Sequence, residues 1–159
     1  MDGLRLRDEM VAQLRRRITG AGSPPVCLAT VLVGDDGPSQ RYVRSKHVQA
    51  EKAGMQSRNE TLPATASQAQ LEDVVGRLAA DPGVHGILVQ SPIPDGLDYD
   101  AVLRLIPADK DVDGLTEISM GRLVKGAPGL VGCTPLGVMR LLERYDVHTA
   151  GRRAVVVGR

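Results

Sequence analysis

The chain has 159 residues, of which 42% are hydrophobic and 25% charged, and its 20 Lys and Arg against 19 Asp and Glu leave a net charge of +1. This length is enough for one α/β domain with a real core and for part of a second domain. Because the basic residues are spread along the chain, we expect neither nucleic acid nor an anionic membrane as a partner.

The first part of the chain predicts a helix, a strand and a second helix. Met10 and Leu14 lie on the apolar stripe of an amphipathic helix. The continuous apolar run over residues 26–33 predicts a strand covered on both faces, and a turn-prone loop follows it. Ser39 is expected to cap the next helix, which carries Tyr42 and Lys46, and Gly54 is placed to end that helix.

Strand and helix then alternate again. Residues 56–62 predict a second strand, residues 67–70 form a capping box for a helix, and residues 84–90 predict another buried strand, which ends at Gln90. This alternation predicts a parallel, layered α/β sheet. Ligands of such sheets bind outside the carboxyl ends of the strands, where both the Tyr42 helix and Gln90 fall.

The last third of the chain predicts short helices and loops, and then a helix that Thr134 and Pro135 begin. Residues 154–158 resemble a buried parallel strand that runs into the first glycine of a nucleotide-binding turn. Because such a strand without a following helix would leave one face uncovered, we expect a truncated chain. Residues 1–122 are predicted to form the first domain, and residues 123–159 a linker helix and the first strand of a second domain.

Tyr42 and Lys46 are the leading candidates for chemistry. They are four positions apart on a predicted helix, so the ring and the amine share one face. The chain has no Phe and no Trp, which makes an aromatic ring among polar helix residues unusual here. A flat ring beside a titratable amine suits a flat substrate. The alternative is a surface helix with a partly buried tyrosine and a solvated lysine.

Two later segments offer further polar candidates. Gln90 ends a strand before a stiff loop with two prolines, and its amide could orient the amine of Lys46; the alternative is an ordinary polar strand end. Residues 109–113 hold three carboxylates, and in an extended segment Asp111 and Asp113 would point the same way and could bind a pair of N–H groups. The alternative is a solvated acidic turn, and metal binding is not expected.

The remaining thiols and imidazoles give weaker indications. The two cysteines, Cys27 and Cys133, form no CxxC motif, so reduced thiols and a cytoplasmic protein are expected. Cys133 lies near a predicted helix start, which can favour a thiolate, but a structural thiol is the preferred interpretation. The three histidines are too scattered to suggest a metal site, and the sequence has neither an apolar leader nor a membrane-spanning stretch.

Several of these segments occur together in a characteristic order. They are Pro38-Ser39 with Tyr42 and Lys46, residues 86–90 with Pro92 and Pro94, residues 110–114, residues 121–123, residues 133–135 and residues 155–159. In this order they resemble the bifunctional methylenetetrahydrofolate dehydrogenase/cyclohydrolase family. The resemblance departs from the family pattern at Ser91 and Ile93, where the family usually has leucines, and these changes are expected to affect only the pocket wall.

The resemblance implies an α/β fold, with a three-layer parallel-sheet folate-binding domain followed by the start of a Rossmann domain. It implies NADP-dependent oxidation of methylenetetrahydrofolate and hydrolysis of the methenyl product to formyltetrahydrofolate. The implied cofactor is NADP, with Gly158 and Arg159 at its phosphate. A tetrahydrofolate derivative is the implied substrate, and the implied assembly is a homodimer once the second domain is present.

The resemblance also implies a role for each candidate residue. Lys46 would be the general acid/base of the hydrolysis, and Gln90 would bind Lys46 and tune its charge. Tyr42 would stack on the folate ring system. Asp113 would accept N–H bonds from the amino group and the adjacent ring nitrogen of the pterin.

Two other functions stay open at this point. The spacing of Tyr42 and Lys46 also occurs in short-chain dehydrogenases, although their glycine-rich cofactor loop comes well before the pair, whereas here the glycine loop at residues 34–37 directly precedes it. The chain could also be an isolated folate-binding fragment without dehydrogenase activity.

Overall fold

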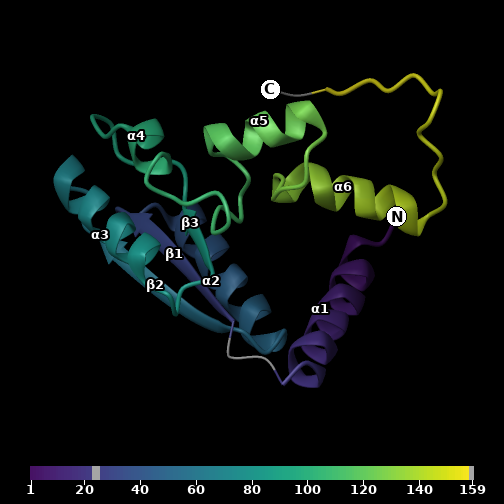
Figure 1. Cartoon of the computed structure of the whole chain (residues 1–159), viewed down its shortest axis with the longest axis horizontal. Helices are drawn as coiled ribbons and strands as arrows, with labels where there is room; N and C mark the ends of the chain where they lie inside the picture. The colour runs from purple at the N-terminus through teal and green to yellow at the C-terminus, as the bar shows by residue number, and fades with distance from the viewer. Residues whose placement is uncertain (23–25, 158–159) are drawn as a thin grey trace.

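The computed structural model describes residues 1–22 and 26–157, and its centre is a three-stranded parallel sheet with the strand order β2-β1-β3 (Figure 1). The strands are β1 (Cys27–Val33), β2 (Gln56–Leu62) and β3 (Gly86–Val89). The helices are α1 (Gly3–Gly20), α2 (Gly37–Lys52), α3 (Gln68–Ala80), α4 (Tyr99–Leu103), α5 (Glu117–Lys125) and α6 (Cys133–Arg144). The predicted parallel α/β sheet is therefore confirmed.

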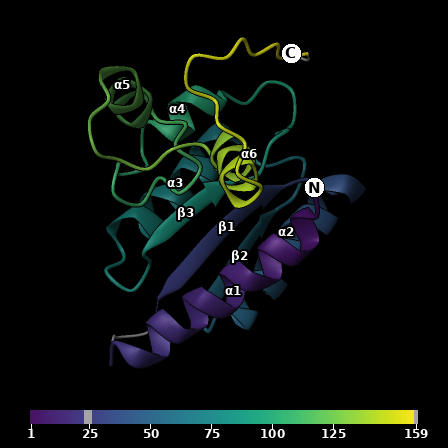
Figure 2. The same cartoon turned by 90° about the vertical axis from the view of Figure 1, so that its right-hand side faces the viewer.

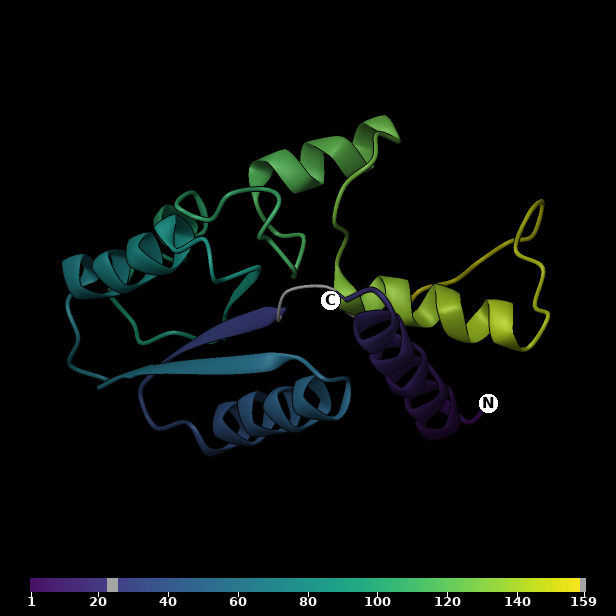
Figure 3. The same cartoon turned by 60° about the horizontal axis from the view of Figure 1, so that its bottom comes forward.

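The two faces of the sheet have different neighbours because side chains alternate along each strand. On one face Val31 and Ile87, both fully buried, pack with the apolar stripe of α3, including Leu71 and Val75. Each large side chain buried in this way contributes about 1.5–3 kcal/mol. The opposite face contacts α2, and Figure 3 shows α3 and α2 on opposite sides of the strands. The sheet and these two helices make the predicted three layers.

The caps of the first two sheet-covering helices agree only in part with the sequence prediction. The capping box of α3 is present, with Ser67 and Gln70 exchanging hydrogen bonds. In α2, however, the prediction that Ser39 is the cap is wrong. Asp36 is the N-cap, and its carboxylate accepts a hydrogen bond of 2.9 Å from the backbone N–H of Ser39. A carboxylate at the N-terminus of a helix also interacts favourably with the helix dipole. At the other end of α2, Gly54 (φ 84°) follows the last helical turn, as predicted.

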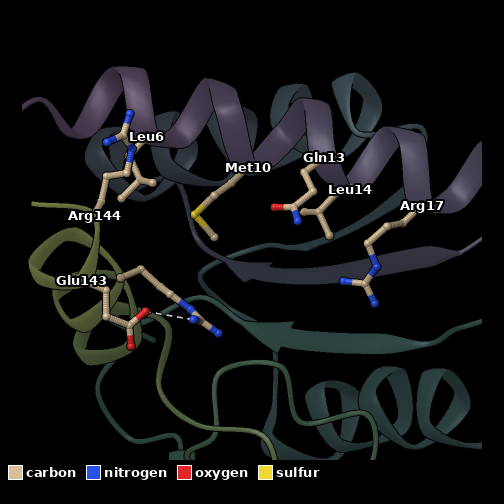
Figure 4. A pocket seen from close by; sticks show the side chains of 8 residues that line it. Leu6, Met10, Gln13, Leu14, Arg17, Glu143 and Arg144 are labelled. Carbon is tan, nitrogen blue, oxygen red and sulfur yellow. Dashed lines mark hydrogen bonds and ion pairs between the residues drawn. The ribbon is translucent and has the colours of Figure 1, made fainter. Parts of the chain in front are cut away.

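Helices α1 and α6 pack against each other beside the sheet, and Figure 2 shows α6 almost end-on above α1. Arg144 of α6 forms an ion pair of 3.2 Å with Glu9 of α1. Between the two helices lies an open groove of about 510 Å³ (Figure 4). Its lining combines apolar side chains of α1 with arginines from both helices, and α1 has no fully buried residue.

The end of the described chain departs from its predicted structure. Residues 154–157 form no strand, and the side chains of Val155, Val156 and Val157 are 87%, 91% and 94% exposed. A parallel strand needs hydrogen-bonding neighbours, and no segment within residues 1–22 and 26–157 pairs with these valines. No helix in the described part of the chain has the length and apolar character needed to cross a membrane.

Candidate functional site

A cavity of about 490 Å³ lies on the sheet face opposite α3. The side chains of Leu28 and Leu88 and the backbone of Gly86 line it from neighbouring positions of β1 and β3. Its ionisable groups are those of Lys46, Asp113, His85, Cys27 and Cys133, and its other lining residues are Val26, Met55, Val112 and Thr134. The cavity thus combines a mostly apolar wall with a few polar groups, as small-molecule sites commonly do.

Lys46, which lines this cavity, contacts Gln90, which is not itself among the lining residues. The Nζ atom of Lys46 donates a hydrogen bond of 3.0 Å to Oε1 of Gln90. The amide nitrogen of Gln90 donates in turn to the carbonyl oxygen of Ser91 at 2.6 Å. This second bond fixes which end of the amide faces the lysine, because only the oxygen can accept. The predicted contact between the Gln90 amide and the Lys46 amine is confirmed.

Asp113 lines the cavity, and three influences act on the pKa of its carboxyl group. Burial raises the pKa of its carboxyl, the positive charge of Lys46 opposes this, and the nearby Asp111 carboxylate adds to the rise. A partly buried carboxylate at a cavity wall gains most from a ligand that donates hydrogen bonds to it.

Asp111 does not share this environment, so the prediction that Asp111 and Asp113 point the same way is wrong. The Asp111 carboxylate is 1% exposed and accepts hydrogen bonds from the backbone N–H groups of Leu115 (3.2 Å) and Thr116 (2.9 Å). Burial alone would raise its pKa, but hydrogen bonds from Ser119, Thr116 and Leu115 outweigh burial and lower it. The segment is a turn and not an extended strand, which separates the two carboxylates.

The loop that carries Asp113 is fixed at its start. Lys110 donates hydrogen bonds of 2.8 and 2.7 Å to the carbonyl oxygens of Ala79 and Asp81 at the end of α3. The carbonyl of Lys110 accepts from the N–H of Ile87 at 2.8 Å, which ties the loop to β3. The side chain of Val112 lies over Gly86, where a Cβ atom would come within 2.5 Å of it. Glycine in β3 therefore lets the loop approach the sheet.

The same loop is held further on by a close backbone crossing. Gly114 has a φ of 64°, and a Cβ atom there would lie 2.6 Å from the carbonyl carbon of Val131 and 2.7 Å from the nitrogen of Gly132. This crossing brings Asp113 beside the start of α6. Cys133, the first residue of α6, donates its thiol hydrogen bond to the carbonyl oxygen of Val112 at 3.2 Å.

The thiol of Cys133 is not activated by its place at a helix start. Desolvation and the negative charge of Asp113 raise its pKa, although Lys46 opposes them. The preferred interpretation of Cys133 as a structural thiol agrees with this pKa and with its bond to Val112.

Tyr42 lies one helical turn before Lys46 but is not among the cavity-lining residues, and its side chain is 64% exposed. It is free to contact a ligand that extends out of the cavity.

Gly158 and Arg159 lie outside the described residues. Met55 and His85 were missed from the sequence, because nothing in their local pattern indicates that the fold brings them to Lys46.

Comparison with known proteins supplies the family. Residues 1–113 match the model of the tetrahydrofolate dehydrogenase/cyclohydrolase catalytic domain. The chain belongs to this family. The match ends at Asp113, so α5 and α6 of this tetrahydrofolate dehydrogenase/cyclohydrolase chain lie beyond it.

Relatives and solved structures agree with this assignment. The bifunctional protein FolD 1 of Streptomyces avermitilis is 48% identical over 163 residues, covering 100% of this chain and 56% of its own length. A crystal structure of the bifunctional enzyme FolD, a methylenetetrahydrofolate dehydrogenase/cyclohydrolase from Campylobacter jejuni, is 39% identical with a TM-score of 0.87, covering 92% of this chain and 53% of that one.

The family includes a structure of the Trypanosoma brucei methylenetetrahydrofolate dehydrogenase-cyclohydrolase in complex with NADP cofactor and an inhibitor. It is 32% identical with a TM-score of 0.89, covering 95% of this chain and 53% of that one. The chain therefore spans about half the length of the relatives that it matches.

The described residues of this family member do not form a cradle for NADP. Such a cradle needs a glycine-rich turn between a strand and the N-terminus of a helix. Residues 154–157 make no strand, and no helix follows them in the described part of the chain. The candidate site that the described residues supply is therefore the cavity lined by Lys46 and Asp113, with Gln90 hydrogen-bonded to Lys46.

Proposed function

We propose that this site hydrolyses methenyltetrahydrofolate to formyltetrahydrofolate, with Lys46 as the general acid/base. The observation that carries the proposal is the 3.0 Å hydrogen bond from Lys46 to Gln90 at a cavity that also bears Asp113. It places a proton-transfer group, an amide that orients it, and a carboxylate for ligand binding around one space. This combination is what positioned acid–base catalysis on a polar heterocycle requires.

The chemistry is the addition of water to a cationic carbon between two nitrogens. As the water oxygen bonds to that carbon, the neutral Lys46 amine takes one proton from the water. The resulting hydroxyl adduct collapses when the bond from carbon to one nitrogen breaks. That nitrogen receives the proton from Lys46, and the hydroxyl proton passes to solvent water as the formyl C=O forms. A neutral amine suits the cationic substrate because an ammonium beside it would repel it.

Gln90 supports the proton transfer by offering an acceptor to the lysine. Its Oε1 atom cannot give a proton, so it directs an N–H bond of Lys46 along one line and leaves the other positions of the amine toward the cavity.

Asp113 and Tyr42 would bind the folate. Asp113 would accept N–H bonds from the pterin, which would relieve the burial of its unpaired charge. Tyr42, exposed on α2, would stack on the part of the bound folate that extends out of the cavity.

We further propose that the whole protein oxidises methylenetetrahydrofolate with NADP, in which case the described residues hold the folate. In this proposal residues 1–122 are the folate-binding domain and residues 123–159 lead into an NADP-binding domain, with Gly158 and Arg159 at the cofactor. The support is the family membership together with the relatives' greater length. The homodimer and the cytoplasmic location stay predictions.

The second candidate function is a folate-binding chain without dehydrogenase activity. It is the alternative that the sequence left open, and the family membership supports the bifunctional enzyme over it. The two candidates differ in what they expect of NADP and not in what they expect of folate.

The test is to mix the 159-residue chain with methenyltetrahydrofolate and follow the loss of its near-ultraviolet absorbance against a buffer blank. Hydrolysis well above the blank is expected, and a rate equal to the blank would contradict the proposed site. Calorimetry should detect binding of a folate but no binding of NADP. A clear NADP signal would show that the division of the two ligands between domains is wrong.

A further inference from the structure

Tyr99, the first residue of α4, contacts β3, the strand that directly precedes Gln90. Its hydroxyl donates a hydrogen bond of 3.0 Å to the carbonyl oxygen of Val89, the last residue of β3. The ring is half-buried and packs against the hydrophobic core on the α3 side of the sheet. Neither the family-model match nor the names of the relatives gives this tyrosine a role.

The hydroxyl fills a gap at an open sheet edge. In a parallel strand, successive residues direct their N–H and C=O groups to alternate edges. The N–H of Gln90 bonds to Val31 of β1, so the carbonyl of Val89 points to the other edge. Among the described residues that edge carries no further strand, and its one bridge joins Ile87 to Asp111. Tyr99 thus supplies the donor that a neighbouring strand would otherwise give.

Tyr99 is itself held in place by α3. The backbone N–H of Asp98 donates to Oε1 of Gln68 at 2.8 Å, and Nε2 of Gln68 donates to the Asp98 carbonyl at 3.2 Å. The Asp98 carboxylate then caps α4 by accepting from the N–H of Ala101 at 2.9 Å. Three sets of hydrogen bonds, from Gln68 to Asp98, from Tyr99 to Val89 and from Lys46 to Gln90, are thus joined through the peptide links Asp98–Tyr99 and Val89–Gln90.

We propose that Tyr99 is a positioning residue: its hydroxyl fixes the end of β3 and thereby the point at which Gln90 presents its amide oxygen to Lys46. The proposal rests on the proposed hydrolysis. In this proposal a side chain that does not line the cavity helps to hold Gln90, and through it Lys46, in position. The position matters because small displacements of a proton-transfer group reduce the reaction rate steeply.

The electrostatics of Tyr99 agree with a permanent donor. Burial raises the pKa of its phenol to about 12, and the negative charges of Asp113, Asp111 and Asp100 add to the rise. The phenol therefore keeps its proton across the pH range in which an enzyme of this kind works.

The test compares Tyr99→Phe with Tyr145→Phe in the 159-residue chain. Both changes remove one hydroxyl and keep the ring, and the Tyr145 hydroxyl accepts only a bond of 2.6 Å from the N–H of Asp2, at the contact of α1 with α6. Tyr99→Phe should lower kcat for methenyltetrahydrofolate hydrolysis about threefold to tenfold and leave KM within about twofold, whereas Tyr145→Phe should leave both unchanged. Equal kcat values for all three proteins would overturn the proposal.

A measurement without substrate separates positioning from stability. The side-chain NH₂ signals of Gln90, observed by NMR, should shift in Tyr99→Phe and not in Tyr145→Phe. If Tyr99→Phe lowers Tm but moves neither these signals nor kcat, the role is merely structural and the proposal fails. Because this arm needs no turnover, it still decides the link from Tyr99 to Gln90 if the wild-type chain does not hydrolyse the folate and the proposed function falls.

A double variant gives the last check. If Tyr99 acts through Gln90, Tyr99→Phe should cause no further loss of kcat in a Gln90→Ala background. Losses that multiply instead would show that the two residues act independently and would overturn the proposed path.

Discussion

The carboxylates of Asp111 and Asp113 are two residues apart in the chain but meet opposite surroundings. Asp111 is 1% exposed and accepts two backbone N–H groups, whereas Asp113 faces the cavity with Lys46. Their pKa values accordingly move in opposite directions, lowered for Asp111 and raised for Asp113. One carboxylate stabilises the loop, and the other is held at a cost to stability in a position where a ligand can use it.

Asp113→Asn is expected to stabilise the fold at pH 7 and to impair folate binding. The raised pKa means that the folded chain binds more protons than the unfolded chain between the two pKa values, so stability falls as the pH rises through that window. Asparagine removes this loss. We expect Tm at pH 7 to rise by roughly 2–4 °C, the shift that about 1 kcal/mol produces in a chain of this size.

The gain should shrink as the pH falls below the folded pKa of Asp113, where the wild-type carboxyl is itself neutral. Thermal unfolding of wild type and Asp113→Asn across this pH range measures the difference in Tm. In a separate assay, the Michaelis constant of Asp113→Asn for folate should be at least tenfold above that of wild type. A variant that is less stable than wild type at pH 7, or that binds folate normally, would contradict this role for Asp113.

Asp111→Ala is expected to destabilise the fold by roughly 2–4 kcal/mol, because it leaves the N–H groups of Leu115 and Thr116 without their acceptor. The lowered pKa of Asp111 means that its contribution is present above the unfolded pKa and is lost as the pH falls through the folded pKa. The difference from wild type in urea unfolding should therefore narrow in acid. The matched control is Asp109→Ala, at an exposed position in the same loop, which should cost less than about 0.5 kcal/mol.

Lys46→Met is expected to remove the hydrolysis while leaving folate binding largely intact. The methionine keeps the length of the stem but cannot transfer a proton, so kcat should fall by about 10²–10⁴-fold. Lys52→Met is the control, since Lys52 is an exposed lysine in the last turn of the same helix. Normal turnover by Lys46→Met, measured at saturating methenyltetrahydrofolate, would exclude Lys46 as the acid/base.

Gly114→Ala is expected to cost roughly 2–5 kcal/mol and to disturb the site. Alanine is strained at a φ of 64°, and its Cβ would overlap the backbone of Val131 and Gly132. Gly121→Ala, within α5, meets no atom within 4 Å and should stabilise the chain by up to about 1 kcal/mol. Urea unfolding of the two variants makes the comparison, and a neutral Gly114→Ala would mean that the crossing is not as tight as described.

The sequence was sufficient for the parts of the fold that depend on local pattern. The buried run of β1, the box of Ser67 and Gln70, and the glycine after α2 each follow from a few neighbouring residues, and each is present. The contact of Lys46 with Gln90 was expected because α2 follows the carboxyl end of β1 and Gln90 follows the carboxyl end of β3. The cavity beside them is lined instead by Val26, Cys27 and His85, at the amino ends of these strands, which the sequence did not indicate.

The rest depends on contacts between distant segments. The separation of Asp111 from Asp113 arises from a turn in which Leu115 and Thr116, just before α5, donate their N–H groups to Asp111, so alternation along an extended chain gave the wrong geometry. Asp36 displaced Ser39 as the cap of α2 because the helix begins earlier, at Gly37. The role of Tyr99 was not foreseen, since its partner Val89 lies ten residues away across a loop with no shared motif.

The crossing of Gly114 with Val131 and Gly132 means that the chain leaves the cavity and returns to it at nearly the same point. Between Gly114 and Val131, the first residues are held to the loop because Thr116 and Ser119 donate hydrogen bonds to Asp111. The later part, from Gly126 to Leu130, is exposed and contacts α5 through the cap at Gly126 and the packing of Gly129 on Arg122. We expect an inserted reporter peptide to be tolerated best in this exposed stretch, because neither Asp113 nor Cys133 belongs to it.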